Sequence, residues 1–316
     1  MFPRFISLSI LLASLSLFDQ AHAFFGRAEF SLEDDFSDSS VMRGIRADKA
    51  ICDQLNPGAV WAEVSPSLGE CIKYWSAGLT ASTQRVVIFL HGDRYDGNRV
   101  TADHAKLTGE RLSTLASDWS RRIKAPYIYI GRPGTHGSSG DHSRRRTLEE
   151  AQILSKTLDA LRQRYGIQEF VLSGQSGGGH MTSSLLTLRN DIICAIPASG
   201  PNSPRIRFQK MGRTIDTTRL QSYEPTEYFS TNAVHPRLRV FILGDPRDSN
   251  VFWESQTILA EPLAARGIEN AIIEGEAIGS QHHSLNNSAR YLAGLCFHDK
   301  STDEIKSFLS KRKIRG

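Results

Sequence analysis

The sequence lacks the features that mark several specialised protein classes. Its 38 basic residues nearly balance its 34 acidic ones, so the net charge of +4 gives no reason to expect nucleic acid as the main partner. It contains one long apolar run, no internal repeat and no long low-complexity linker. With 40% hydrophobic residues and a mean hydropathy of −0.31, the composition is typical of a soluble globular protein. It excludes a disordered chain and a multi-span membrane protein.

The one long apolar run, residues 5–18, lies at the very start of the chain. Arg4 precedes it, and Ala21-His22-Ala23 after it is typical of a small-x-small cleavage site. The run falls short of the roughly 20 residues that a helix needs to span a bilayer. We therefore expect residues 1–23 to be a removed signal peptide rather than an uncleaved anchor. The mature protein would be secreted or periplasmic, without stable membrane insertion.

Export affects the interpretation of the four cysteines, Cys52, Cys71, Cys194 and Cys296. An even number in an oxidising compartment suggests two disulfides, with three alternative pairings. We favour Cys52–Cys71 within the N-terminal segment and Cys194–Cys296 between a central strand and the last long helix. The alternative for Cys194, in the apolar run 192–196, is a buried free thiol. None of the four shows metal-ligand spacing, which argues against a structural zinc site.

After residue 70, apolar runs typical of strands alternate with helical patterns. Strands are expected at residues 71–75, 85–90, 126–130, 169–173, 192–198, 238–243 and 271–273. Helices are expected through residues 112–119, 147–165, 180–188, 251–265 and 285–296. The helix 147–165 has the clearest signals, because Thr147 and Glu150 form a capping-box pattern and Gly166 follows its last apolar residue.

This alternation implies parallel strands joined by right-handed crossovers, with helices on both faces of the sheet. We therefore predict an α/β protein with a doubly wound, mostly parallel sheet in one domain, residues 71–300. Residues 24–70 would form an N-terminal extension and residues 301–316 a basic C-terminal tail. Residues 199–235, after the strand at 192–198, would be a small lid or a long loop.

The motif that predicts chemistry is the pentapeptide 174–178, GQSGG, which fits G-x-S-x-G. Five residues recur by chance, but this motif lies between an apolar strand and an apolar-faced helix. A serine at such a turn takes a strained backbone conformation that lifts its hydroxyl above the sheet. Glycines flank it because a Cβ there would collide with the adjoining strand or helix. The alternative is a plain glycine turn with an inert serine.

On this motif and its setting, the chain resembles the α/β-hydrolase superfamily over about residues 71–296. The resemblance implies that Ser176 is a nucleophile, followed by an acid after a later strand. Asp248 with Val251 looks like the D-x-x-V of the family, so Asp248 is the favoured acid. The alternatives are Asp245, which lies nearer the strand end, and a structural role for Asp248 as a helix cap.

The resemblance also implies a histidine after the last strand. His283-Ser284-Leu285 fits the order of a histidine, a small residue and an apolar residue that is common in the family, and His283 is favoured. His282 is the alternative, because it fits the glycine-x-x-histidine form. A metal-binding pair is disfavoured, since adjacent side chains diverge and no other ligands are expected nearby.

Two backbone amides would form the oxyanion hole. One is the amide of Gly177, and the other comes from residues 89–93, FLHGD, which look like the His-Gly element of the family. We assign this second donor to Asp93, although some family members have a second glycine at this place. Residues 131–142 resemble an R-P-G-x-x-G-S loop, in which Arg132 would pair with a nearby acid rather than touch substrate. The basic runs 144–146 and 311–315 are expected to be solvated charge.

The resemblance implies an exported serine hydrolase that cleaves a carboxylic ester through an acyl-enzyme, with no metal or organic cofactor. Its partner would be a small-molecule ester or a peptide. A serine peptidase of the prolyl-oligopeptidase-like branch is the alternative within this class, less favoured because no propeller or gating domain precedes the catalytic region. A non-catalytic binding protein that keeps the fold is the alternative from another class.

Overall fold

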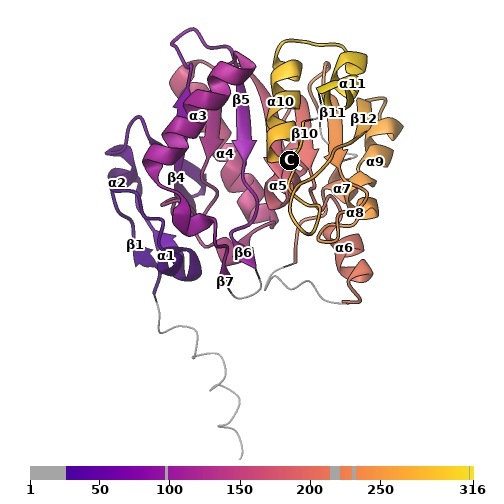
Figure 1. The fold of residues 1–316 in the computed structure, drawn as a ribbon. Coiled ribbons are helices and arrows are strands. Elements are labelled where there is room, and N and C mark those ends of the chain that lie inside the picture. The colour runs from indigo at the N-terminus through magenta and orange to yellow at the C-terminus, as the bar shows by residue number, and fades with distance from the viewer. Residues whose placement is uncertain (1–25, 97–98, 214–220, 230–232, 313) are drawn as a thin grey trace, which may run out of the picture.

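The computed structural model of the chain describes residues 26–96, 99–213, 221–229, 233–312 and 314–316 (Figure 1). The expected signal peptide, residues 1–23, lies outside this range. Within it, the helices are all too short or too polar to cross a membrane.

An eight-stranded sheet forms the centre of the molecule (Figure 1). Its strands lie in the order β12-β11-β10-β9-β5-β8-β4-β3. Strand β4 alone runs in the direction opposite to all the other strands. Their bounds are β3 (Ala59–Ser65), β4 (Leu68–Ala77), β5 (Arg85–Leu90), β8 (Tyr127–Ile130), β9 (Glu169–Gln175), β10 (Ile192–Ala198), β11 (Arg239–Gly244) and β12 (Glu269–Glu274). The continuous apolar run of β5 is buried on both faces, as a central parallel strand requires.

Helices cover both faces of the sheet, and each face has its own hydrophobic core. One face packs against α3 (Gly109–Ile123), α10 (Asn286–Phe297) and α11 (Thr302–Arg312). The other packs against α4 (Leu148–Tyr165), α5 (Gly177–Leu186) and α9 (Ala260–Ala265). The predicted doubly wound, mostly parallel α/β sheet is confirmed.

Shorter elements connect these layers. They are β1 (Ala28–Glu29), α1 (Asp38–Arg43), β2 (Ile45–Arg46), α2 (Lys49–Asp53), β6 (Tyr95–Asp96), β7 (Arg99–Val100), η1 (His104–Lys106), η2 (His142–Arg144), α6 (Pro204–Lys210), α7 (Pro225–Tyr228) and α8 (Trp253–Thr257). The helix expected over 251–265 is therefore two short helices, α8 and α9. Of the expected lid or loop 199–235, the described part contains α6 and α7.

Two boundaries differ from the sequence prediction. Strand β3 and the start of β4 lie before residue 71, so the segment predicted as an N-terminal extension supplies an edge strand of the sheet. The predicted basic tail is mostly helix α11, in which Ile305 and Leu309 are buried against the sheet-side core. Their spacing of four puts both side chains on one helical face, a pattern that the basic residues around it obscure.

Both favoured disulfides are present. Cys52–Cys71 joins α2 to β4, and Cys194–Cys296 joins β10 to α10. The N-terminal segment also supports the loop 131–142, because Ile45 and Gly140 exchange two backbone hydrogen bonds of 2.8 Å. These contacts hold the loop 131–142, which follows strand β8, against the N-terminal segment.

Candidate active site

Ser176 lies at the sharp turn between β9 and α5, at the carboxyl edge of the sheet. Its φ of 56° and ψ of −120° are a strained conformation for a residue with a side chain. Its backbone N–H donates to the carbonyl oxygen of Ala198 at the end of β10 (2.8 Å), which holds the turn against the sheet. The glycines are sterically necessary, because a Cβ on Gly177 would overlap Asp93 Oδ1 and one on Gly178 would overlap the Leu90 carbonyl oxygen.

The structure brings Asp248 and His283 together from two loops far apart in the sequence. His283 Nδ1 lies 2.7 Å from Asp248 Oδ2, and the Asp248 side chain is fully buried. The other carboxylate oxygen, Oδ1, accepts from the backbone N–H groups of Asn250 (2.8 Å) and Val251 (2.9 Å). These two bonds fix the orientation of the carboxylate, while Oδ2 accepts from Gln256 Nε2 (3.2 Å) and faces the imidazole.

The two alternatives take other positions. Asp245 accepts hydrogen bonds from Arg247 and from the Ala277 backbone N–H, and so joins the ends of two neighbouring loops. Burial would raise its pKa, but these hydrogen bonds outweigh burial and lower the pKa to about 2. His282 has a φ of 51° and does not line the cleft that contains Ser176 and His283. The geometry therefore groups Ser176 with Asp248 and His283.

The imidazole of His283 has one nitrogen without a partner. Its Nε2 atom is buried and makes no hydrogen bond to the part of the chain that the structure describes. Ser176 and His283 line the same cleft, and no hydrogen bond joins their side chains. In enzymes without substrate such bonds are commonly long and shorten in the complex.

Gln175, the residue before the serine, links the turn to the histidine loop. Its Nε2 donates to the carbonyl oxygen of His283 (2.6 Å), and its Oε1 accepts from the backbone N–H of Leu285 (2.9 Å). In the G-x-S-x-G pattern, Gln175 occupies the first variable position, to which the pattern assigns no role. Its polar, buried side chain at the end of a strand is the signal that could have identified it.

The backbone amide of Gly177 directly follows the serine, and that of Asp93 follows Gly92, where an added Cβ would lie 3.3 Å from Ser176 Cβ. The hydrogen bonds found over the described residues include none donated by either amide. The side chain of Asp93 lies against the Cα of Gly177, since a Cβ there would overlap Asp93 Oδ1. The loop of Asp93 and the serine turn are therefore in direct contact.

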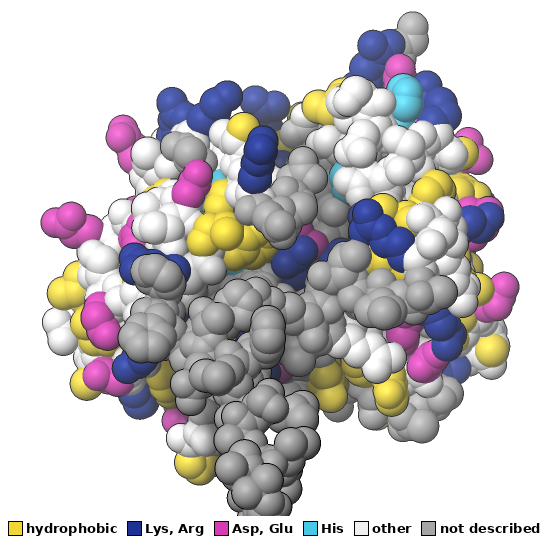
Figure 2. Space-filling view, turned by 90° about the horizontal axis from the view of Figure 1, so that it is seen from below, with side chains coloured by type: hydrophobic (Ala, Val, Ile, Leu, Met, Phe, Trp, Pro, Cys, Tyr) yellow, Lys and Arg dark blue, Asp and Glu magenta, His cyan; other side chains and the backbone are white. Residues whose placement is uncertain are grey.

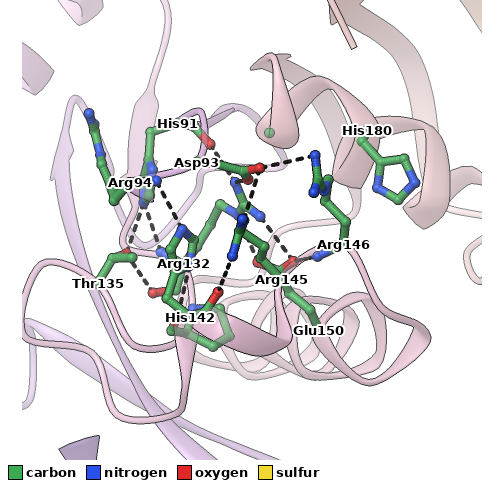
Figure 3. Close-up of polar contacts among 12 residues, drawn as sticks. His91, Asp93, Arg94, Arg132, Thr135, His142, Arg145, Arg146, Glu150 and His180 are labelled. Carbon is green, nitrogen blue, oxygen red and sulfur yellow. Dashed lines mark hydrogen bonds and ion pairs between the residues drawn. The ribbon is translucent and has the colours of Figure 1, made fainter. Parts of the chain in front are cut away.

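A buried ion network fixes the loop of Asp93 (Figure 3). Arg132 is fully buried and donates to both oxygens of Glu150 (2.7 and 2.9 Å) and to Asp93 Oδ1 (2.9 Å). The prediction that Arg132 pairs with acids to hold its loop is confirmed. Burial would lower the pKa of Arg132, but the two carboxylates raise it.

Two arginines of the run 144–146 join this network, which corrects the prediction of solvated charge. Arg145 Nε and Arg146 Nη1 each lie 3.3 Å from Asp93 Oδ2, and both side chains are largely buried. Burial would raise the pKa of Asp93, but Arg146, Arg132 and Arg145 hold it well below its usual range. These arginines turn inward because they directly precede α4, whose residue Glu150 accepts from the Arg146 backbone N–H.

Two buried histidines join the same loops (Figure 3). The backbone N–H of Arg132 donates to His91 Nε2 (3.1 Å), and that of Arg94 donates to His142 Nε2 (3.0 Å). Each Nε2 is thus an acceptor, which places the ring proton on Nδ1. Burial lowers the pKa of both histidines well below its usual value. Both rings are therefore neutral parts of the scaffold.

Ser176, His283 and Asp93 line a cleft of about 1180 Å³ at the carboxyl edge of the sheet. One part of its wall is apolar and contains Phe89, Leu107, Leu112, Leu115 and Val251. Another part carries arginines, and Lys or Arg side chains lie near the centre of this face beside a hydrophobic patch (Figure 2). Throughout the described ranges, no group of three or more His, Cys, Asp or Glu side chains is arranged to hold a metal ion.

No protein-family model and no curated protein matches the sequence. Solved structures do match the fold. The uncomplexed acylaminoacyl peptidase of Pyrococcus horikoshii aligns with a TM-score of 0.52 and 15% identity, over 81% of this chain and 41% of that one. Prolyl oligopeptidase B of Galerina marginata aligns with a TM-score of 0.50 and 11% identity, over 75% and 36%. Est1E of Butyrivibrio proteoclasticus with ferulic acid aligns with a TM-score of 0.48 and 13% identity, over 81% and 99%.

The chain spans about two fifths of the length of the Pyrococcus peptidase. The strand order, the helices on both faces and the strained serine turn agree with this similarity. The fold of this chain is that of the α/β-hydrolases.

Proposed function

We propose that this protein is an exported serine hydrolase that cleaves a carboxylic ester through an acyl-enzyme. The observation that carries the proposal is the hydrogen bond of 2.7 Å between His283 Nδ1 and Asp248 Oδ2. It leaves His283 Nε2 without a partner among the described residues, in the cleft that also contains Ser176. This arrangement is the one that nucleophilic catalysis by a serine requires.

In the proposed reaction, His283 Nε2 takes the proton of the Ser176 hydroxyl as Oγ attacks the carbonyl carbon of the ester. Asp248 orients the imidazole and stabilises its positive charge. The amides of Gly177 and Asp93 donate to the oxyanion; losing one such donor typically costs about 2.7–4 kcal/mol. His283 then protonates the departing alkoxide, and water repeats the attack on the acyl-enzyme, which restores Ser176.

The charges in the cleft favour an ester over a peptide that is recognised by its N-terminus. An exopeptidase that binds a substrate ammonium group needs a free carboxylate. The carboxylates that line the described cleft are Asp93 and Asp103, and arginines already pair with both. A peptidase acting on an acylated or internal peptide bond is the second candidate, because the fold matches an acylaminoacyl peptidase.

Export is proposed from the N-terminal sequence together with the two disulfides, which fit an oxidising compartment. Mass spectrometry of the mature protein should find its N-terminus at Phe24. A mature chain that keeps residues 1–23 would contradict this part of the proposal.

A fluorophosphonate probe tests the catalytic part. We expect it to label the folded protein at Ser176 and to leave Ser176→Ala unlabelled. A folded wild-type protein that resists the probe would favour the non-catalytic binding protein. Rates with 4-nitrophenyl esters and with acylated peptidyl amides then decide between the two substrate classes, and faster cleavage of the amides would favour the peptidase.

A further inference from the structure

The cleft around Ser176 carries an excess of positive charge. Six arginines line it, namely Arg94, Arg145, Arg146, Arg207, Arg213 and Arg290, against the two carboxylates Asp93 and Asp103. Asp103 pairs with Arg94 at 2.6 Å. Asp93 is shared by Arg132, Arg145 and Arg146. Over the described residues, no carboxylate lining the cleft remains for the other arginines.

Among the described residues, the hydrogen-bond partner of the Arg207 side chain is the neutral Asn250. Arg207 lies on α6, where its Nε donates to the Asn250 carbonyl oxygen (2.9 Å) and its Nη2 to Asn250 Oδ1 (2.7 Å). Its Nη1 makes no hydrogen bond, and no carboxylate lies within ion-pair distance, within the part of the chain that the structure describes. Burial and then the positive charge of Arg146 lower the pKa of Arg207 to about 10, although the more distant carboxylates Asp93 and Asp248 partly offset them. A negative charge in the cleft would relieve this repulsion.

Arg290 also lacks a carboxylate partner among these residues, but its surroundings differ. Its guanidinium carbon lies 3.7 Å from the ring centroid of Phe89, and its Nε donates to the Tyr127 hydroxyl (2.9 Å). Stacking on an aromatic face stabilises a cation. Arg290 is therefore held as part of the wall, whereas the Nη1 atom of Arg207 makes no hydrogen bond to the described residues.

The position of Arg207 ties it to the catalytic loop. Its partner Asn250 is two residues after Asp248 and donates its own N–H to the Asp248 carboxylate. The apolar wall, which includes Phe89 and Leu112, belongs to the same cleft. The cleft thus offers space for an apolar arm and a cation for a charged end.

We propose that the substrate is an ester that bears a carboxylate, and that Arg207 is the specificity-determining residue that binds this group. The planar guanidinium suits a carboxylate, and Arg207 keeps its Nη1 donors, which make no hydrogen bond to the described residues. This inference rests on the proposed hydrolase function, since it names the substrate class of the same site.

The test compares two esters that differ at one end: mono-4-nitrophenyl adipate, which has a free carboxylate, and its methyl ester, in which this end is uncharged. We expect wild-type enzyme to prefer the carboxylate in kcat/KM by about tenfold or more. The preference should shrink as NaCl rises from 50 to 500 mM, because salt screens the attraction. Equal or faster hydrolysis of the methyl ester at low salt would overturn the inference.

Variants then assign the preference to Arg207. Arg207→Gln should reduce the ratio of the two kcat/KM values by tenfold or more, and Arg207→Lys should retain part of it. The matched control is Arg205→Gln on the same helix, because Arg205 is exposed and pairs with Glu227; it should keep the wild-type ratio. An Arg207→Gln enzyme that is folded and keeps that ratio would contradict the assignment.

The failure of the hydrolase proposal has a separate signature. In that case neither ester is cleaved, and the fluorophosphonate probe does not label Ser176. Labelling of Ser176 together with a preference for the methyl ester would refute the carboxylate inference and leave the hydrolase proposal standing. If Arg207→Gln does not fold, the wild-type comparison and its salt dependence still decide whether a carboxylate is preferred, and an unchanged ratio in Arg207→Lys would contradict the assignment to Arg207.

Discussion

The side-chain amide of Gln175 is clamped to the backbone on both sides of Ser284: it donates to the carbonyl oxygen of His283 and accepts from the N–H of Leu285. Gln175 directly precedes Ser176, so one side chain sets the distance between the serine turn and the histidine loop. A second link, from the Ser249 N–H to the Gln281 carbonyl oxygen (3.0 Å), joins the histidine loop to the loop of Asp248. The three loops are thus held together by bonds outside the proposed triad.

Gln175→Ala should therefore lower kcat while KM stays close to the wild-type value. Losing both bonds frees the His283 loop, and a displacement of about 1 Å costs roughly 100-fold in rate. Steady-state kinetics with a 4-nitrophenyl ester measure the effect. A purely structural role would instead appear as a lower thermal midpoint with unchanged kcat per mole of labelled Ser176.

Asp248→Asn should reduce kcat by roughly 10³–10⁴-fold, because an amide no longer holds the imidazole in the required tautomer. Asp245→Asn is the matched control. Asp245 holds Arg247 and the Ala277 N–H rather than an imidazole, so its loss should reduce stability more than kcat. The comparison needs kcat and urea midpoints for both variants. If Asp245→Asn is the one that abolishes turnover, the assignment of the acid is wrong.

The sheet and the grouping of Ser176, Asp248 and His283 could be predicted because they depend on local patterns. Apolar runs indicate strands, and parallel strands bring their carboxyl ends, and the loops after them, to one edge. The loop after β11 and the loop after β12 had to meet near the serine turn. Val251 favours Asp248 over Asp245 in the sequence, and in the structure its N–H donates to Asp248 Oδ1 and orients the carboxylate.

The charged groups could not be placed in this way. Arg145 and Arg207 look like surface charge in the sequence, because pairing with Asp93 or Asn250 depends on how distant loops fold over the sheet edge. Likewise, the basic residues of 301–316 hide the apolar face of α11, which packs only because β12 and α10 present a core to it. Tertiary contacts of this kind carry no short-range signal.

Removing the two disulfides should have unequal effects on stability. Cys194–Cys296 spans 102 residues and Cys52–Cys71 spans 19. In the chain-entropy model the longer loop contributes about 4–5 kcal/mol and the shorter about 3 kcal/mol to the free energy of unfolding. Urea unfolding of Cys194→Ala/Cys296→Ala and Cys52→Ala/Cys71→Ala checks the order. A larger loss from the shorter loop would mean that native packing, rather than chain entropy, dominates.

The described chain buries five histidines whose pKa lies below its usual value: His91, His104, His136, His142 and His180. Burial is the largest cause for each, and it lowers the pKa of His104 to about 4 and that of His180 to about 3. In the unfolded chain these histidines titrate near pH 6.5. Below that pH the unfolded state binds more protons than the folded state, so acid favours unfolding.

The free energy of unfolding should therefore be highest above about pH 6.5 and should fall as the pH drops toward 4. Each neutral buried histidine contributes about 1.4 kcal/mol per pH unit to the slope of this fall. His104→Phe supplies the control. Both ring nitrogens of His104 lack hydrogen-bond partners among the described residues, and aromatic rings surround it. His104→Phe should remove the contribution of one histidine from the slope of the free energy of unfolding against pH, and it should not lower that free energy at pH 7.5. Urea unfolding at pH 7.5, 6.0 and 5.0 measures both slopes, and a wild-type free energy of unfolding that stays constant over this range would contradict the neutral, buried state of these rings.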